Sequence, residues 1–314
     1  MAYLCIPLIA PLQMMWNGTG VCKVYGMNMR KYLLCIVLVF VFLAGSPAHG
    51  NKTGDTIHAK SYCVLNAATG TIIKAKNIDE PIQPASLAKV LSLYVIFEAI
   101  QNKKIHLDDQ VKISKKAWQT GGSQMFLEPD TEVELETLMK GMAIVSANDA
   151  ATALAEYVDG DVPTFVARMN RTASLLGMKN SRFANPHGLP AKGGITTARD
   201  MAILADIYIR RFPWALDLHS QRSYSYHEIT QPNRNRLLGK YPEVDGLKTG
   251  FTRVSGYHTI VTACKGEQRY IIVLMGAKTP EKRNREAAAL LKEVLRTGHT
   301  SGKKHASPQI GMSL

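Results

Sequence analysis

A serine and a lysine at the start of one strongly apolar segment are the residues best suited to chemistry. Ser86 and Lys89 lie three positions apart within residues 81–100, "PIQPASLAKVLSLYVIFEAI". Residues with this spacing share one face of an α-helix. The segment is apolar nearly all the way round, which indicates a helix buried on every side. A lysine desolvated there has a lowered pKa and can accept the serine proton, so the pair predicts an activated nucleophile.

The same spacing also has a purely structural interpretation. Ser86 can cap the helix, while the ammonium group of Lys89 can reach water at the end of its alkyl chain. The pattern is also common, because Ser301 and Lys304 repeat it in the polar C-terminal segment. The pair alone therefore does not establish a catalytic site.

Two other short motifs add weight to the pair. Ser146-Ala147-Asn148 falls between two segments with helical periodicity, where it is also typical of a capping cluster. Lys248-Thr249-Gly250 lies in a segment of strand character, where it is also compatible with a solvated strand edge. Lys52-Thr53-Gly54 repeats its three letters near the N-terminus. The specific feature is the order: a serine and lysine at a helix start, then the serine–asparagine motif, then the strand motif.

The surrounding pattern predicts how these motifs are held. Residues 57–75 predict two strands joined by a turn, and residues from 244 onward predict a three-stranded meander followed by a closing helix. Residues from 85 to about 210 have helical periodicity in successive segments. The simplest arrangement is one mixed five-stranded sheet built from both ends of the chain, with residues 85–240 forming a helical lobe. The cleft between sheet and lobe is then the expected site.

Composition excludes several other classes of protein. The chain has 314 residues, 46% hydrophobic and 20% charged, which is typical of a globular protein of one or two domains. The formal net charge of +13 favours an anionic partner. Lysines and arginines are scattered and aromatic residues make up only 7%, so no nucleic-acid partner is predicted. Histidines and cysteines show no metal-ligand spacing, so neither a metal nor another cofactor is predicted.

The N-terminal region is typical of export. Within "MRKYLLCIVLVFVFLAGSPAHG", basic residues precede an apolar run from Tyr32 to Gly45, and small residues predict cleavage after Ala48. The run is shorter than the ~20 residues of a membrane span and fits a secretory h-region of ~7–15 residues. We therefore predict a signal peptide over residues 27–48, with residues 1–26 a wrongly assigned leader. An uncleaved N-terminal membrane anchor is the alternative.

The mature protein is predicted to be a single catalytic domain over residues 49–298, with a disordered tail over residues 299–314. No C-terminal membrane anchor is evident, so the protein is expected to be periplasmic or otherwise extracytoplasmic, and soluble after cleavage. Its two remaining cysteines, Cys63 and Cys264, are predicted to be free thiols. If the third meander strand lies between their strands, they are two strand spacings, ~9.6 Å, apart, which exceeds disulfide reach.

The three motifs in this order resemble the signature of penicillin-binding proteins and serine β-lactamases. The phrases "PASLAKV", "GGSQMFLEPDTEVELETLMKGMAIVSANDAATALAEYV" and "VDGLKTGFT" are similar to those of low-molecular-mass D-alanyl-D-alanine carboxypeptidases of peptidase family S11. The resemblance covers residues from about Ile57 to Arg296. It implies an α/β (α+β) fold of the β-lactamase/transpeptidase type, with a five-stranded antiparallel sheet flanked by helices plus an α-helical lobe.

The resemblance also implies a role for each motif residue. Ser86 would attack the carbonyl of the penultimate D-alanine, with Lys89 as its base. Ser146 would relay a proton to the leaving amine, and Asn148 would hold Lys89 and the substrate amide. The residues implied to bind substrate are Lys248, Thr249, Gly250, Phe251 and Arg283.

Among the substrate-binding residues, Lys248 would supply positive potential and Thr249 would bind the terminal carboxylate. The backbone N–H groups of Ser86 and Phe251 would form the oxyanion hole. Arg283, which the resemblance places just before the closing helix, would assist the carboxylate. The alternative is that Arg283, like Arg285, is a solvated residue at a helix start.

The resemblance implies a penicillin-sensitive serine-type D-Ala-D-Ala carboxypeptidase that acts on peptidoglycan stem peptides, with β-lactams as covalent inhibitors. A D,D-endopeptidase that cleaves cross-links, or a non-catalytic penicillin-binding protein, would carry the same motifs. A β-lactamase is disfavoured, because the loop "RFANPHGLPAKGG" has no glutamate of the kind that class A enzymes use for deacylation.

Overall fold

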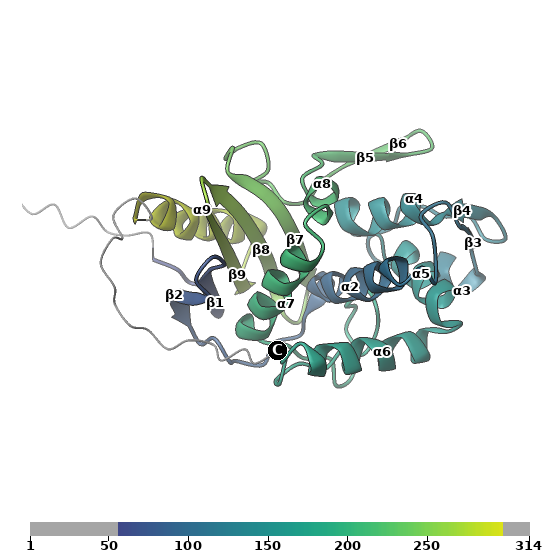
Figure 1. The fold of residues 1–314 in the computed structure, drawn as a ribbon, viewed down its shortest axis with the longest axis horizontal. Helices are drawn as coiled ribbons and strands as arrows, with labels where there is room; N and C mark the ends of the chain where they lie inside the picture. The colour runs from purple at the N-terminus through teal and green to yellow at the C-terminus, as the bar shows by residue number, and fades with distance from the viewer. Residues whose placement is uncertain (1–55, 298–314) are drawn as a thin grey trace, which may run out of the picture. The chain divides into compact units, whose positions relative to one another are not determined.

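The central sheet joins the two ends of the described chain. The computed structural model describes residues 56–297, so the signal-peptide, start-site and tail predictions lie outside the described residues. The strands of the sheet are β1 (Ser61–Asn66), β2 (Thr71–Lys76), β7 (Val244–Thr252), β8 (Gly256–Lys265) and β9 (Gln268–Ala277). Their order is β2-β1-β9-β8-β7, so the N-terminal hairpin pairs with the C-terminal meander (Figure 1). Every neighbouring pair is antiparallel, which confirms the antiparallel sheet that the family resemblance implied. The mixed sheet expected from the strand pattern alone is wrong.

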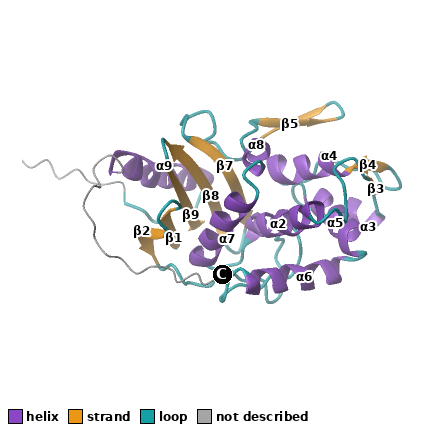
Figure 2. Cartoon of the chain, in the orientation of Figure 1, coloured by secondary structure: helices purple, strands orange, loops and turns teal. Residues whose placement is uncertain are grey.

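Both faces of the sheet are covered, which explains why its inner strands are apolar along their length. In β9, Ile271 and Val273 belong to the core shared with the helical lobe, whereas Ile272 and Leu274 pack toward the closing helix α9 (Pro280–Thr297). This alternation follows from the two-residue repeat of a strand. Figure 2 shows α9 on one side of the strands and the other long helices on the opposite side.

The helical lobe is built around α2 (Ala88–Gln101). Eleven of its fourteen residues are buried, which confirms the prediction of a helix buried on every side. The other helices of this part of the chain are α3 (Lys115–Trp118), α4 (Leu135–Lys140), α5 (Asn148–Asp159), α6 (Val162–Leu175), α7 (Ala198–Arg211) and α8 (Ala215–His219). A π-helical turn, η2 (Gly141–Val145), links α4 to α5.

Three features of this region differ from the sequence expectation. Helix α7 packs on β1 and β9, so it covers the sheet within the stretch assigned to the lobe. Two small hairpins were not expected, and their strands are β3 (Gln110–Lys112), β4 (Glu132–Glu134), β5 (Ser223–Tyr226) and β6 (Ile229–Pro232).

None of the helices within residues 56–297 has the length and apolarity needed to cross a membrane.

Candidate active site

The candidate nucleophile lies at a sharp turn into the buried helix. The 3₁₀ turn η1 (Ala85–Leu87) runs directly into α2. Ala85 has φ 47°, a left-handed conformation that is uncommon for a residue with a side chain. Leu87 and Ala88 are buried on the helix side, while Ser86 is only partly buried. The turn thus presents the Ser86 hydroxyl at a surface and fixes the backbone beneath it.

Lys89 is held directly under this serine. Its Nζ donates to Ser86 Oγ at 3.1 Å, to Asn148 Oδ1 at 2.6 Å and to the carbonyl oxygen of His187 at 2.8 Å. The side chain is fully buried. Desolvation, and next the positive charge of Lys248, lower the pKa of Lys89 well below its usual value. A lysine with this pKa gives up its proton readily, and its lone pair can then accept the proton of the Ser86 hydroxyl.

The serine–asparagine motif approaches from the lobe. Asn148 begins α5, and its Nδ2 donates to the carbonyl oxygen of Gly121 at 2.7 Å, which orients the Oδ1 that Lys89 contacts. Ser146 closes the π-helical turn in a left-handed conformation, with φ 68°. Its buried Oγ has no hydrogen-bond partner among the described residues. A buried hydroxyl without a hydrogen-bond partner lowers the stability of the fold. Because Ser146 lies close to Asn148, its hydroxyl is available to bind a substrate or to transfer a proton.

The third motif reaches the serine because β7 passes against η1. A Cβ placed on Gly250 would lie 3.1 Å from the backbone nitrogen of Ser86 and 3.1 Å from Ala85 Cβ. Glycine therefore allows the close approach that puts the strand motif beside the helix start. Lys248 and Thr249 are both buried on this strand. Burial, followed by the charges of Arg234 and Arg283, lowers the pKa of Lys248 to about 7.

Arg283 also belongs to this cluster of charges, but it lies in the first turn of α9 and not before the helix. It is 6% exposed, so the alternative of a solvated residue is wrong for Arg283 and fits only Arg285. Its Nε and Nη2 donate to Asn284 Oδ1 at 3.0 and 2.8 Å, and Nη2 donates to the carbonyl oxygen of Arg234 at 3.3 Å. Burial lowers the pKa of Arg283 to about 10, so the guanidinium is charged at neutral pH.

Sequence reasoning missed Arg234, whose positive charge lowers the pKa of both Lys89 and Lys248. It lies in the loop before β7, between two buried asparagines that tie the loop down. Asn235 Nδ2 donates to the carbonyl oxygen of Gly246 at 3.0 Å, and Asn233 Nδ2 donates to that of Gln221 at 2.9 Å. Arg234 itself is exposed. The "NRN" triplet is the only signal that marks it, because the loop has no periodicity.

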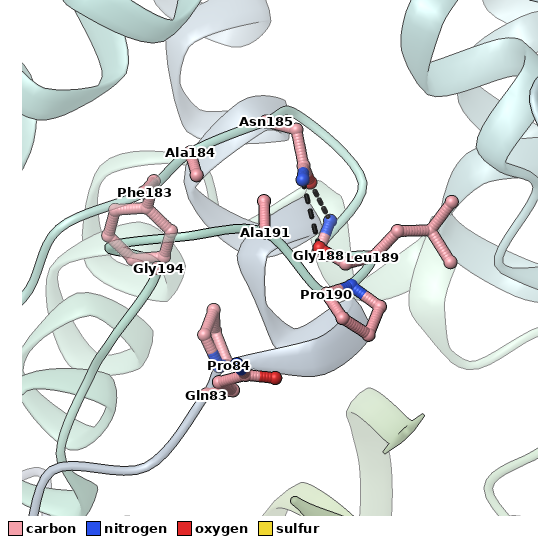
Figure 3. Close-up of a pocket in the computed structure, with 10 residues that line it drawn as sticks. All are labelled: Gln83, Pro84, Phe183, Ala184, Asn185, Gly188, Leu189, Pro190, Ala191 and Gly194. Carbon is pink, nitrogen blue, oxygen red and sulfur yellow. Dashed lines mark hydrogen bonds between the residues drawn. The ribbon is translucent and has the colours of Figure 1, made fainter. Parts of the chain in front are cut away.

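A loop over residues 183–194 lies against Gln83 and Pro84, the residues that lead into the Ser86 turn (Figure 3). Asn185 closes it, since Oδ1 accepts from the backbone N–H of Gly188 at 2.6 Å and Nδ2 donates to the carbonyl oxygen of Leu189 at 2.9 Å. A Cβ on Gly188, which has φ 84°, would lie 1.7 Å from the carbonyl oxygen of Ala85. The crevice between this loop and Gln83 has a volume of about 10 Å³, so it holds one water at most. The loop therefore packs against the Ser86 turn, and the crevice between the loop and Gln83 is too small to hold a substrate.

This site contains a serine next to a buried lysine, at the junction of a sheet and a helical lobe. Such a pair is typical of a serine acyl-transfer enzyme, in which the hydroxyl attacks a carbonyl and forms an ester. Within residues 56–297, no group of three histidine, cysteine or acidic side chains is placed to hold a metal ion.

The chain belongs to the D-alanyl-D-alanine carboxypeptidase family of serine peptidases, Peptidase_S11, whose family model matches residues 48–279. It is 40% identical over 262 residues to the D-alanyl-D-alanine carboxypeptidase DacC of Escherichia coli, covering 80% of this chain and 66% of the relative. The chain therefore spans about two thirds of that relative's length.

Solved structures give the same result. Penicillin-binding protein 5 from Haemophilus influenzae superposes with a TM-score of 0.75 at 39% identity, over 77% of this chain and 72% of that one. Penicillin-binding protein D2 from Listeria monocytogenes, in its ampicillin-bound form, superposes with a TM-score of 0.70 at 28% identity, over 76% of this chain and 97% of that one. The fold is thus that of the penicillin-binding proteins.

Proposed function

We propose that this protein is a serine-type D-Ala-D-Ala carboxypeptidase that removes the terminal D-alanine from peptidoglycan stem peptides. The observation that carries the proposal is the 3.1 Å contact between a buried Lys89 Nζ and Ser86 Oγ, in a chain that belongs to this family. Peptidoglycan lies outside the cytoplasm, which agrees with the predicted signal peptide. That prediction concerns residues outside the described range.

The reaction starts with transfer of the Ser86 hydroxyl proton to neutral Lys89. Oγ then attacks the carbonyl carbon of the penultimate D-alanine and forms a tetrahedral oxyanion. The backbone N–H groups of Ser86 and Phe251 stabilise this oxyanion, and removal of one such donor typically costs about 2.7–4 kcal/mol. The oxyanion collapses as the C–N bond breaks, and Ser146 relays the proton held by Lys89 to the departing amine of D-alanine, which leaves Lys89 neutral. Water then hydrolyses the Ser86 ester and frees the enzyme.

Substrate selection rests on the cluster of positive charges. The hydroxyl of Thr249 and the guanidinium of Arg283 would bind the free terminal carboxylate, with Lys248 and Arg234 adding positive potential. Charge-assisted hydrogen bonds from a guanidinium are stronger than neutral ones, so Arg283 favours a peptide with a free C-terminus. Gly250 has no side chain, so it allows strand β7 to approach Ser86 closely. Asn148 would orient both Lys89 and the substrate amide.

A β-lactam should acylate the same serine, since the Listeria relative binds ampicillin. The test is to measure D-alanine release from a soluble pentapeptide and covalent labelling by a fluorescent penicillin. Ser86→Ala should abolish both, whereas Ser301→Ala, in the repeated motif of the C-terminal segment, should change neither. Retained labelling of the Ser86→Ala protein would refute the assignment. A cross-linked muropeptide assayed in parallel measures D,D-endopeptidase activity, and penicillin labelling without hydrolysis of either substrate would indicate a non-catalytic binding protein.

A further inference from the structure

A surface beside the active site carries positive charges without acidic partners. Two cavities, of about 280 and 300 Å³, lie on the loop before β7, and both are lined by Arg236 and Lys240. The first also reaches Arg285 and Lys292 on α9, and the second reaches Arg222. We call the two cavities together the basic groove. None of its five cations forms an ion pair within residues 56–297, although arginines and lysines elsewhere pair with carboxylates.

Two of the five cations in the groove, Arg222 and Lys292, are positioned by neighbouring groups. The guanidinium of Arg222 packs against the backbone of Gly239, where an added Cβ would lie 2.4 Å from its Nη2. Lys292 Nζ lies 5.9 Å from the centre of the Tyr241 ring. The one carboxylate in the groove is Glu281, whose pKa is lowered by backbone hydrogen bonding at the start of α9. Cations fixed in this way lose little conformational entropy on binding an anion.

The groove begins next to the residue proposed to bind the substrate carboxylate. Asn284 lines the first cavity, and its Oδ1 is the acceptor for both Nε and Nη2 of Arg283. The positive charge of Arg236 lowers the pKa of Arg283 as well, so the two guanidinium groups lie near each other. A ligand in the groove would therefore lie beside the terminal carboxylate of the peptide bound at Ser86.

We propose that the basic groove binds the carboxylates of a neighbouring stem peptide in the same peptidoglycan polymer as the peptide being cut. This inference rests on the proposed function, because the polymer is present whenever Ser86 acts on it. Two cavities that share a cationic wall suit a chain with more than one carboxylate, and guanidinium groups bind carboxylates through paired N–H donors. The first cavity is also lined by Leu237 and by the aromatic ring of Tyr241, which suit peptide more than bare anions. Holding a second peptide raises the effective concentration of the first at the active site.

The test measures binding of the full chain to purified sacculi by co-sedimentation, with Ser86→Ala in every sample to prevent hydrolysis. Adding Lys240→Glu and Arg285→Glu should lower retention about fivefold, since two exposed charge contacts become repulsive. Lys104→Glu with Arg171→Glu is the control, because both residues are exposed, form no ion pair within residues 56–297 and change the net charge equally. Thermal melting, and penicillin labelling of the same variants with Ser86 restored, check that they fold.

Two chemical treatments of the sacculi identify the ligand. Amidation of the peptide carboxylates should lower retention of the parent protein about as much as the groove variant does, and removal of phosphate-linked polymers should not. Equal losses for the groove and control variants would mean bulk charge attraction, and would overturn the proposal. Unchanged retention of the groove variant, or dependence on phosphate and not on carboxylate, would also overturn it. D-Alanine release by the unmodified enzyme is measured separately, so failure of the proposed function is distinguishable from failure of the groove.

Discussion

Replacing Arg283 with alanine tests how the free carboxylate of the substrate is recognised. Asn284 and the carbonyl of Arg234 occupy Nε and Nη2 of this buried guanidinium, and Nη1 has no partner among the described residues. Loss of one charged hydrogen bond costs about 1.5–3 kcal/mol. Since about 1.4 kcal/mol is a tenfold change, we expect kcat/KM for a D-Ala-D-Ala peptide to fall about 10- to 100-fold.

The same substitution should change the pH dependence of the reaction through Lys248. The pKa of Lys248 is about 7, so its attraction for the carboxylate is lost as the pH rises through this value. Removing Arg283 takes away a neighbouring positive charge and admits water, and both changes raise the pKa of Lys248. The basic limb of the kcat/KM profile should therefore move to higher pH, because this profile reports the groups of the free enzyme.

The assay is D-alanine release from a soluble pentapeptide across the pH range, with Arg296→Ala as the matched control. Arg296 is an exposed arginine in the last turn of the same helix, so its loss should leave kcat/KM unchanged. Acylation by a β-lactam ester without a free carboxylate should also change little in the Arg283 variant. Equal losses for the peptide and the ester, with a basic limb that does not move, would show that Arg283 supports the fold and does not recognise the carboxylate.

Three further outcomes are expected. Intact-mass thiol counting of the denatured, unreduced protein should find Cys63 and Cys264 both free, and in the native protein Cys264 should react first, because burial raises the pKa of Cys63 to about 12. Gly188→Ala should slow penicillin acylation more than tenfold, since its Cβ would overlap the carbonyl oxygen of Ala85. The free energy of unfolding should decrease from pH 7 to pH 5 by up to about 2 kcal/mol per buried histidine. Burial lowers the pKa of these histidines to about 3 for His187 and His219 and about 4 for His258.

Each of these outcomes has its own check. A mass that shows no free thiol in the monomer would contradict the strand order, in which β9 separates β1 from β8. Gly193→Ala is the control for Gly188→Ala: its φ of 83° is within 1° of that of Gly188, but its Cβ would lie 3.9 Å from the nearest atom. Below about pH 6.5 the histidines are protonated in the unfolded chain but stay neutral in the fold. Their contribution to the free energy of unfolding is therefore full above about pH 6.5 and is lost progressively below it. Equal denaturant midpoints and slopes at pH 7 and pH 5 would argue against three neutral histidines.

The sheet and the buried helix were predictable because their signals are local and periodic. Residues 81–100 are apolar on nearly every side of the predicted helix, which predicted that α2 is buried. The segments of strand character at both ends of the chain predicted all five strands of the sheet. The family resemblance implied that Asn148 would hold Lys89 beside Ser86. In the structure, Lys89 Nζ donates to Asn148 Oδ1 at 2.6 Å and to Ser86 Oγ at 3.1 Å.

The missing parts depend on tertiary packing that leaves no periodic signal. The carbonyl of His187 is a third acceptor for Lys89, but any residue can supply a carbonyl, so the sequence cannot mark it. The positive charge of Arg234 lowers the pKa of Lys89 and Lys248 because tertiary packing brings the three residues close together. The asparagines on either side of Arg234 hold its loop in place. Helix α7 has the same periodicity whether it packs on a helix or on a sheet, so its partner was not predictable.

The order of strands in the sheet has a consequence for when the enzyme becomes reactive. β1 pairs with β9, and β7 contacts the Ser86 turn, so the nucleophile meets its partner strand only after the C-terminal third of the chain has been made and folded. Closing such long loops is slow compared with forming helices. Covalent capture of penicillin is then a reporter of the finished fold. In refolding experiments, labelling should appear after helix content has been regained, and labelling that rises together with helical circular dichroism would contradict this sequence of events.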